Sequence, residues 1–277
     1  MNDAILSNPK SERVRRIASL ARKKDRQYHG RFLVEGPQSV RELLVHRADL
    51  VETVYATRGA EPWQPELDRL ASEAGVRLEH ATPEVIAAMA ETVSPQGVVA
   101  VARMWESDLA ETLSGARLVA ILHEIRDPGN AGTVLRAADA AGADAVVFAG
   151  ESVDPFHPKV VRSTTGSLFH LPVVVAGSLA EVIGAAREAG LASIAADVRG
   201  ADLLAARVDG VLDGPVAWVF GNEARGLTEA DRALADRSVR LPIYGAAESL
   251  NLATAASVLL YETAFAQRAA TGEAAGD

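Results

Sequence analysis

Hydrophobic positions recur along the chain with a period of about 3.6 residues in some segments and about 2 in others, which predicts alternating helices and strands. In residues 11–24, Val14, Ile17 and Leu20 form one apolar stripe among basic residues, which indicates an amphipathic helix. Further helices are expected at 37–45, 65–74 and 83–90, and strands at 31–36, 51–57, 76–81 and 97–104. Residues 1–105 are therefore expected to form a small α/β domain.

Residues 106–116 are polar and weakly patterned, so we expect a short linker there, and the alternation restarts at residue 117. The second half, 117–277, is expected to be one α/β domain. Strands are predicted at 117–122, 145–149, 172–176, 191–196, 216–220 and 238–242, and helices at 131–141, 158–167, 178–189, 228–235 and 249–268. Apolar strands separated by helices predict a parallel sheet covered on both faces, with ligands beyond the carboxyl ends of the strands.

Composition narrows the class of protein. Of the 277 residues, 48% are hydrophobic, which suits a folded core, and none is Cys, which excludes disulfides and cysteine-ligated metals. No apolar run reaches the roughly 18 residues of a membrane helix, and the first residues contain no secretory hydrophobic region. We expect a cytoplasmic, soluble protein with no membrane partner.

Charge is distributed unevenly along the chain. The net charge is −9, but residues 1–31 hold nine basic and three acidic residues, a net of +6 that leaves −15 for the remainder. A basic arm on an acidic body is typical of a protein with a polyanionic partner, because local clusters set the contact field. A solvated amphipathic helix would show the same pattern.

The first candidate for chemistry is the segment that runs from His123 to Arg136. A strand ends, a Pro-Gly turn follows, and Asn130 is suited to cap a helix that begins near Ala131. Arg136 then lies in an otherwise small and apolar helix, where it needs an anionic partner such as a phosphate or carboxylate. A purely structural alternative is capping plus a salt bridge from Arg136 to a nearby Asp. Neither a phosphate-binding P-loop nor a dinucleotide-binding glycine motif is present.

The second candidate runs from Val219 to Leu227, where a buried strand leads into a turn that contains Gly221 and Gly226. Two glycines permit close approach of a ligand to the backbone, and Glu223 lies in the turn. The alternative is an ordinary strand-to-helix turn with Thr228 as helix cap.

The third candidate is the segment Leu241 to Ala255, in which a strand ends at a proline and an irregular loop follows. A helix of small residues then begins at Ser249-Leu250-Asn251. Simple capping by Ser249 would explain this segment without any function. Each of the three segments, taken alone, fits a structural explanation at least as well as a catalytic one.

Taken together, the three segments resemble the SpoU branch of the SPOUT RNA methyltransferases. The matching patterns are N-x-G-x-x-x-R at 130–136, F-G-N-E-x-x-G-L at 220–227 and L-P-I followed by S-L-N-x-A-x-A at 241–255, in the family's order. The resemblance covers about 117–268. Residues 1–105 are more loosely similar to the L30e/L7Ae-like substrate-binding domain that precedes many such enzymes.

The resemblance implies an α/β domain with a parallel sheet and a deep trefoil knot, which no periodicity would suggest. It implies transfer of a methyl group from S-adenosylmethionine to an RNA ribose 2′-hydroxyl, by a homodimer and without a metal. A front domain of this kind favours 23S rRNA over tRNA. The implied cofactor contacts are Gly221, Leu241, Ile243 and Leu250.

The resemblance also implies a catalytic group made of Arg136, Asn130, Glu223, Ser249 and Asn251. Because a guanidinium loses its proton only at a pH above about 12, we expect Arg136 to bind the target phosphate and stabilise alkoxide charge rather than act as a base. Glu223 would orient Arg136 or accept the proton. The expected RNA contacts of the arm are Arg22, Lys23, Lys24, Arg26 and Arg31.

Three other functions remain open from the sequence. These are a tRNA ribose methyltransferase, an RNA-binding protein without catalytic activity, and a small-molecule enzyme on a doubly wound sheet. The small-molecule enzyme is disfavoured because the basic arm is present and a phosphate-binding loop is not.

Overall fold

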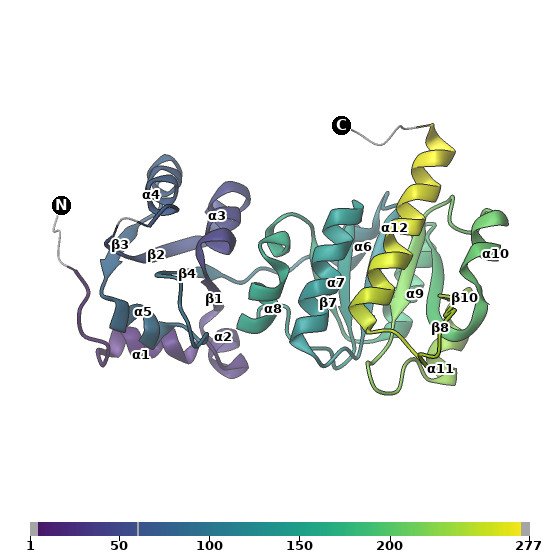
Figure 1. Cartoon of the computed structure of the whole chain (residues 1–277), viewed down its shortest axis with the longest axis horizontal. Helices are drawn as coiled ribbons and strands as arrows, with labels where there is room; N and C mark the ends of the chain where they lie inside the picture. The colour runs from purple at the N-terminus through teal and green to yellow at the C-terminus, as the bar shows by residue number, and fades with distance from the viewer. Residues whose placement is uncertain (1–4, 60, 273–277) are drawn as a thin grey trace. The chain divides into compact units, whose positions relative to one another are not determined.

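The computed structural model describes residues 5–59 and 61–272 (Figure 1). These residues form two compact units, each with its own sheet. The first contains the chain up to Trp105 together with Asp154–His170, and the second contains Glu106–Val153 and the chain from Leu171 onward. Within the described residues, no helix is both long and apolar enough to cross a membrane.

A four-stranded mixed sheet with the order β1-β4-β2-β3 organises the first unit. Its strands are β1 (Arg31–Glu35), β2 (Val51–Thr57), β3 (Leu78–Ala81) and β4 (Val98–Arg103). Strand β4 is antiparallel to both β1 and β2, whereas β2 and β3 are parallel. The helices are α1 (Glu12–Ser19), α2 (Lys23–His29), α3 (Pro37–His46), α4 (Gln64–Glu73), α5 (Pro83–Met89) and α8 (Pro158–Thr164), with short turns η1 (Ala48–Leu50) and η2 (Ser167–Phe169).

The basic arm forms two helices instead of the single predicted one. Ser11 caps α1 by accepting from the backbone N–H of Val14, and the apolar stripe of α1 is buried in the core beside α5 and the sheet. Helix α1 ends at Ser19, and α2 begins at Lys23. The break lets Arg26 turn inward, where it donates to the backbone oxygens of Leu20 and Ala21.

The expected linker at 106–116 is not an extended connection. It contains helix α6 (Leu109–Leu113), capped by Asp108, whose Leu113 is fully buried in the core of the second unit. The expected assignment of 117–277 to one domain also differs from the structure, because Asp154–His170 packs with the first unit. There, Arg162 forms an ion pair with Glu35 of β1 at 3.1 Å. The order of hydrophobic and polar residues within 106–116 and 154–170 does not show which distant segment each of them packs against.

The second unit contains the predicted parallel sheet, which is confirmed, in the strand order β10-β8-β9-β5-β6-β7. Its strands are β5 (Leu118–His123), β6 (Ala145–Ala149), β7 (Val173–Ala176), β8 (Ala192–Asp202), β9 (Val216–Phe220) and β10 (Arg237–Arg240). The remaining helices are α7 (Pro128–Ala141), α9 (Leu179–Glu188), α10 (Leu203–Val208), α11 (Glu229–Leu234) and α12 (Leu252–Thr271).

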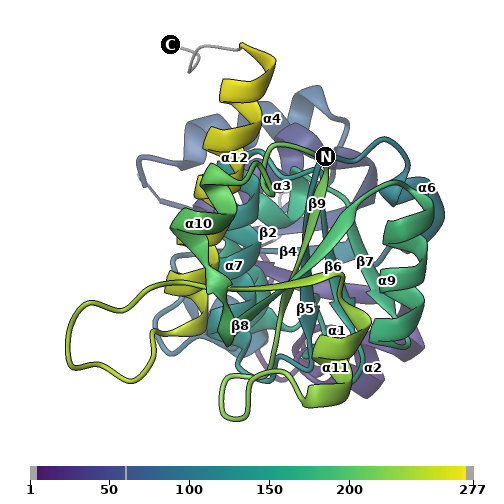
Figure 2. The ribbon, with the colours of Figure 1, turned by 90° about the vertical axis from the view of Figure 1, so that its right-hand side faces the viewer.

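Helices cover both faces of this sheet, as apolar strands without alternation require. Helices α7 and α12 pack against each other on one face, and α6 and α9 cover the other (Figure 2). On the α12 side, the buried indole of Trp218 donates to the hydroxyl of Thr263 at 2.8 Å. This bond fixes α12 over the centre of the sheet and so fixes the start of the helix beside the ends of the strands.

Strand β8 contains a long bulge opposite β10. Ser238 pairs with Ala195, but the next residue, Val239, pairs with Ala201, so residues 196–200 leave the ladder. Gly200 lies so close to β10 that a Cβ there would be 2.5 Å from the carbonyl carbon of Ser238. The bulge turns residues 196–199 toward the carboxyl end of the neighbouring strand β9, where the pocket lies.

Candidate active site

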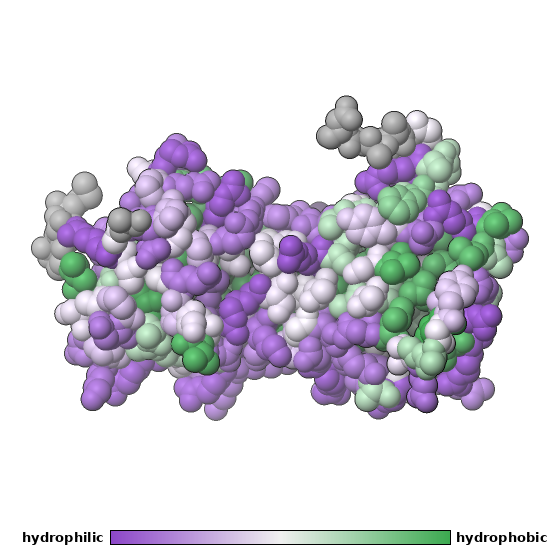
Figure 3. All heavy atoms as spheres, viewed as in Figure 1, coloured by the Kyte–Doolittle hydropathy of each residue, from purple (hydrophilic) through white to green (hydrophobic). Residues whose placement is uncertain are grey.

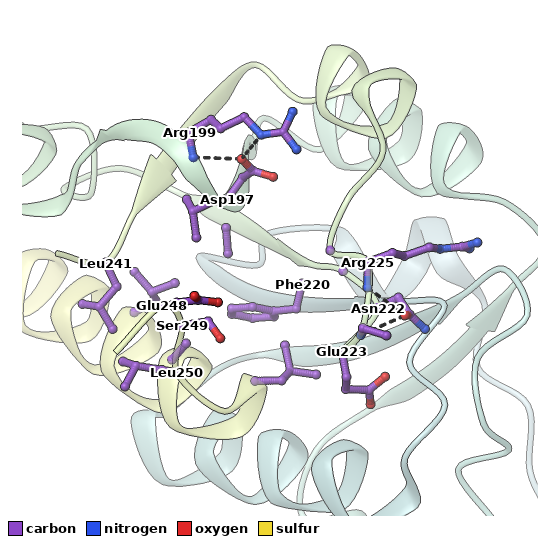
Figure 4. Close-up of a pocket in the computed structure, with 18 of the residues that line it drawn as sticks. Asp197, Arg199, Phe220, Asn222, Glu223, Arg225, Leu241, Glu248, Ser249 and Leu250 are labelled. Carbon is purple, nitrogen blue, oxygen red and sulfur yellow. Dashed lines mark hydrogen bonds and ion pairs between the residues drawn. The ribbon is translucent and has the colours of Figure 1, made fainter. Parts of the chain in front are cut away.

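A pocket of about 420 Å³ opens at the carboxyl ends of the parallel strands in the second unit (Figure 4). Its walls are the bulge of β8 (196–199), the turn after β9 (220–226), the loop that follows β10 (residues 241–250) and the first turns of α12. The loop after β10 extends away from the sheet (Figure 2). This is the edge of a parallel sheet at which ligands are expected.

All four residues predicted to contact the cofactor line this pocket: Gly221, Leu241, Ile243 and Leu250. Leu241, Ile243 and Leu250 are partly or largely exposed apolar side chains of the loop, and Phe220 adds a buried ring at the end of β9. Their role in cofactor binding stays a prediction, but they lie on one continuous surface, as it requires.

The turn after β9 is held by its own backbone and by Asn222. A Cβ at Gly221 would be 2.7 Å from the backbone of Gly226 and Leu227, so only glycine fits there. Asn222 accepts from the backbone N–H groups of Ala224 and Arg225 and donates to the carbonyl oxygen of Glu124 at 2.8 Å. The turn is therefore fastened to the end of β5.

Glu223 connects this turn to the start of helix α7. Its carboxylate accepts from the backbone N–H groups of Arg126 at 3.2 Å and Asp127 at 3.1 Å, and from the side-chain amide of Asn130 at 3.4 Å. A carboxylate is favoured here because the backbone donors at the start of a helix carry partial positive charge. With both oxygens accepting, Glu223 is placed to position its neighbours.

The third segment reaches the same point through Asn251. Its side-chain amide donates to the side-chain oxygen of Asn130 at 3.0 Å, while its own oxygen caps α12 by accepting from Ala253 and Thr254. A chain of hydrogen bonds therefore joins Asn251, Asn130 and Glu223, one residue from each of the three segments.

Two capping assignments from the sequence were wrong. Helix α7 begins at Pro128 and is capped by Asp127, which accepts from the backbone N–H of Asn130, so Asn130 lies in the first turn. Helix α12 is capped by Asn251 and not by Ser249. In α7 the Asp127 cap leaves the side chain of Asn130 to bridge the two helices, whereas in α12 the oxygen of Asn251 caps and its amide N–H bridges. Ser249 lines the pocket from the loop.

Arg136 lies farther along α7, at an exposed position on the helix, and it does not line the pocket. The structure thus brings Asn130, Glu223 and Asn251 into contact and places Ser249 at the pocket wall. It leaves the catalytic role of Arg136 as a prediction.

Sequence reasoning missed the residues of the β8 bulge and Glu124. Asp197 accepts from the backbone N–H of Arg199 at 2.9 Å, and both residues line the pocket (Figure 4). Glu124 has a positive φ of 56°, unusual for a residue with a side chain, and its carboxylate pairs with Arg225. The sequence gives little indication that residues 196–199 belong to the site, because they reach it only through the strand order that places β8 beside β9.

Asp231 of α11 contacts His123, the last residue of β5. Asp231 is 3.4 Å from the ring nitrogen Nε2 of His123 and caps α11 together with Thr228. Burial alone would raise the pKa of Asp231, but hydrogen bonds from Thr228 and the nearby imidazole outweigh burial, so this pKa is lowered. Asp231 therefore serves as a charged anchor between β5 and α11.

The chemistry of the pocket suits S-adenosylmethionine. The volume lies within the range of about 300–1,000 Å³ that is typical of small-molecule sites. The loop and Phe220 offer apolar surface for a purine. Carboxylates of Asp197, Glu223 and Glu248 and the guanidinium of Arg199 offer partners for ribose hydroxyls and for an amino acid group. The residues present fit the cofactor that the motifs imply.

The predicted RNA-contact residues divide into two groups. Arg22, Lys23 and Lys24 are exposed, and Arg31 is half-buried and paired with Glu52. Arg26 is completely buried and forms an ion pair with Asp154 at 2.6 Å, so its assignment as an RNA contact is wrong. Burial explains the difference, because the inward turn of α2 gives this arginine a structural partner.

A groove of about 330 Å³ adds basic residues to the same unit. It is lined by Arg13, Arg16, His29 and Arg31, beside Tyr55 of β2. Arg13 stacks over the ring of Tyr55 at 5.2 Å and pairs with Glu79. The hydrogen bond to Glu79 raises the pKa of Arg13, and the carboxylates of Glu79 and Glu52 balance the charges of Arg13 and Arg31 in this groove.

Comparison with known proteins identifies both halves of the chain. Residues 117–261 match the model of the SpoU rRNA Methylase family, and residues 11–100 match that of the MRM3-like substrate binding domain. The family resemblance and the front substrate-binding domain expected from the sequence are thereby confirmed.

Full-length relatives are similar along nearly the whole chain. The 23S rRNA (guanosine(2553)-2′-O)-methyltransferase RlmP of Bacillus subtilis is 32% identical over 92% of this chain and 97% of its own length. The 23S rRNA (uridine(2479)-2′-O)-methyltransferase of Streptomyces viridochromogenes is 34% identical over 88% of this chain and 86% of its own.

Among solved structures, the SpoU methyltransferase AviRb from Streptomyces viridochromogenes, in complex with AdoMet, superposes with a TM-score of 0.81. It is 31% identical, and the match covers 94% of this chain and 100% of that one. The fold of a cofactor-bound methyltransferase therefore extends over both units of this protein.

Proposed function

Because this chain belongs to the SpoU rRNA methylase family, we propose that it transfers a methyl group from S-adenosylmethionine to a ribose 2′-hydroxyl of RNA, with 23S rRNA as the favoured substrate. One observation carries the proposal. The hydrogen-bonded chain from Asn251 through Asn130 to Glu223 joins three distant segments at the pocket where strands β8, β9 and β10 end.

The pocket residues Gly221, Leu241, Ile243 and Leu250 would hold the cofactor, largely through backbone groups and apolar contact. When bound, S-adenosylmethionine supplies a methyl group already activated by its sulfonium, so the transfer needs no metal. The task of the protein is then to align the ribose oxygen with the methyl group and to assist loss of the hydroxyl proton.

The catalytic roles are proposed from the family motifs and from the chemistry of each side chain. Arg136 would bind the target phosphate and stabilise negative charge on the ribose oxygen. Asn130 and Asn251 would position the ribose, and Ser249 would contact it from the loop. Glu223 is engaged with backbone N–H groups at the start of α7, which favours positioning of this helix over proton acceptance.

RNA binding is proposed for the first unit, whose family model describes a substrate-binding domain. The exposed Arg22, Lys23 and Lys24 and the half-buried Arg31 would contact phosphates, since phosphate charge dominates the affinity of such contacts. A ribosomal RNA substrate makes the cytoplasm the proposed location.

A homodimer is proposed through α12. Exposed apolar side chains gather on this helix and on α10, where the space-filling view shows a hydrophobic area (Figure 3). They are Val258, Tyr261, Phe265, Leu204 and Val208. Contiguous exposed apolar patches often mark protein–protein interfaces. The trefoil knot stays a prediction from the family resemblance.

One experiment tests the proposed activity. Purified protein is incubated with methyl-labelled S-adenosylmethionine and, separately, with 23S rRNA, 16S rRNA or tRNA, and the modified position is mapped. Label in the ribose of 23S rRNA is expected. Label in tRNA alone would replace the favoured substrate by its nearest rival.

A second measurement tests the alternative that the chain binds RNA but does not catalyse methyl transfer. Calorimetric titration with S-adenosylmethionine is expected to show saturable binding, which Leu250→Arg should abolish by placing a charge on the apolar wall. RNA binding without cofactor binding and without label on any RNA would leave the non-catalytic RNA-binding protein as the better account.

A further inference from the structure

We propose that Glu42, His46 and His170 form a binding site for one divalent transition-metal ion of the zinc type in the first unit. The carboxylate and the two imidazoles each offer one ligand atom, and the three atoms all lie within 4.8 Å of one another. No step of the proposed methyl transfer uses these residues, so the site is separate from the pocket of the second unit.

The geometry around one oxygen atom carries the proposal. Oxygen Oε2 of Glu42 is 3.2 Å from Nε2 of His170 and 3.4 Å from Nε2 of His46. Zinc binds nitrogen and oxygen at about 2.0–2.2 Å in a tetrahedron, whose ligand atoms are therefore about 3.3 Å apart. The two distances match this spacing, so an ion can reach all three atoms with small side-chain rotations.

Glu42 is held in place by its surroundings. Its side chain is 10% exposed, and its other oxygen, Oε1, accepts from Gln38 at 2.7 Å and from Arg41 at 2.8 Å. Behind it the backbone of Gly166 approaches so closely that a Cβ there would be 2.3 Å from Cγ of Glu42. One carboxylate oxygen is thus committed to structural partners, and the other faces the two imidazoles.

The two imidazoles lie close enough together to ligate one cation, since their ring centroids are 4.4 Å apart. Neutral imidazole is a common ligand of zinc, cobalt and nickel, and two of them with one carboxylate form a recognised ligand set. Because His46 and His170 are more exposed than Glu42, a fourth position is open to water.

The ion would fasten a segment that returns from far along the chain. Glu42 and His46 belong to α3, whereas His170 follows η2, 128 positions after Glu42. The segment 154–170 packs with the first unit although its neighbours on both sides belong to the second. A metal that joins α3 to residue 170 would therefore stabilise the packing of this segment.

The test uses the full chain without a histidine tag, freed of metal by a chelator and titrated calorimetrically with Zn²⁺. Binding of one Zn²⁺ per chain is expected, with affinity reduced at least tenfold in both His46→Ala and His170→Ala. His29→Ala, which removes a histidine of the same unit outside the cluster, should bind as the wild type does. Co²⁺ in place of Zn²⁺ should give the intense visible absorption of four-coordinate cobalt, lost in both cluster variants.

Folding of the variants is checked without metal by their unfolding temperatures, so loss of binding is distinguished from loss of structure. Zn²⁺ should raise the unfolding temperature of the wild type and of His29→Ala but not of the cluster variants. Absence of Zn²⁺ binding by the wild type, or binding retained in both cluster variants, would overturn the proposal and leave the contacts of Glu42 with His46 and His170 as purely structural.

Discussion

The side-chain amide of Asn251 donates to the side-chain oxygen of Asn130 across 3.0 Å, although the two residues are 121 positions apart. The bond connects the first residues of α12 and α7, the two helices that pack together on one face of the parallel sheet. Asn130 in turn donates to Glu223, which lines the pocket. A substitution at any of the three residues is therefore expected to alter the geometry of the pocket wall. Asn251 caps α12 with its side-chain oxygen and bridges to Asn130 with its amide N–H. Substitutions at this residue can therefore distinguish an effect on stability from an effect on methyl transfer.

We expect Asn251→Asp to keep the helix cap and lose the bridge. Aspartate caps as well as asparagine, but it has no N–H to donate to Asn130. The unfolding temperature should stay near the wild-type value while methyl transfer falls. Asn251→Ala removes both functions and should in addition cost about 1 kcal/mol of stability. Thermal unfolding and initial rates measure the two effects, and a fully active Asn251→Asp would show that the bridge has no catalytic role.

Arg136→Ala is expected to fold and to bind S-adenosylmethionine normally but to lose methyl transfer by about 100-fold or more, as for other donors that stabilise developing charge. Arg136→Lys should restore little, because a compact ammonium cannot replace the planar guanidinium. Single-turnover rates with saturating RNA and calorimetry with cofactor check both statements. Arg237→Ala, at an exposed position on β10 of the same unit, is the control. Near-normal turnover of Arg136→Ala would remove this residue from the site.

The exposed lysines of α2 are expected to contribute to RNA affinity. Lys23→Glu with Lys24→Glu should weaken RNA binding and flatten its dependence on salt, since each phosphate contact contributes a slope of about 0.7–0.9 to the plot of log affinity against log salt. Turnover at saturating RNA should change little. Filter binding at several salt concentrations measures the RNA affinity and its salt dependence. Arg69→Glu on α4, a charge reversal elsewhere on the same unit, is the control. An unchanged slope in the lysine variant would contradict the assignment.

Arg26→Ala is expected to destabilise the first unit instead of weakening RNA contact. The side chains of Arg26 and Asp154 are 1% and 9% exposed, so removal of the guanidinium leaves a buried carboxylate without its partner. Such a loss typically costs about 3–5 kcal/mol. Arg22→Ala, which breaks the exposed pair with Asp25, should cost less than about 1 kcal/mol. Denaturant unfolding compares the two, and equal stabilities would mean that the buried pair contributes nothing.

Asp236 should make stability depend on pH at the acid end. Hydrogen bonds from Arg187 and Ser193 lower its pKa from 3.8 to about 2. Because the folded pKa lies below the unfolded one, this contribution is fully present above the unfolded value and is lost as pH falls through the folded one. Asp236→Asn should therefore be less stable than the wild type near neutral pH, with the difference shrinking between about pH 4 and pH 2. Urea unfolding of the wild type and of Asp236→Asn at a series of pH values tests this, and a difference that stays constant from pH 7 to pH 2 would contradict it.

Much of the site was predictable because the motif residues follow strand ends. Gly221, Leu241, Ile243 and Leu250 do share one pocket, and Glu223, Asn130 and Asn251 are in contact. The caps of α7 and α12 were assigned to the wrong residues, because several neighbouring polar side chains suit the capping position equally well. The bulge of β8 was not predicted, since only its pairing with β10 reveals it.

The sequence by itself determined the type and order of most helices and of all the strands, but not α2, α6 and α10, because hydrophobic periodicity reports which side of each longer element is buried. It also determined the three motif segments and the placement of each after a strand. Only the tertiary structure decided the strand order that brings β8 beside β9, the burial of Arg26 against Asp154, and the meeting of Glu42, His46 and His170. The physical reason is the same in each case: periodicity records that a side chain is buried or exposed, whereas its partner is chosen by packing between segments far apart along the chain.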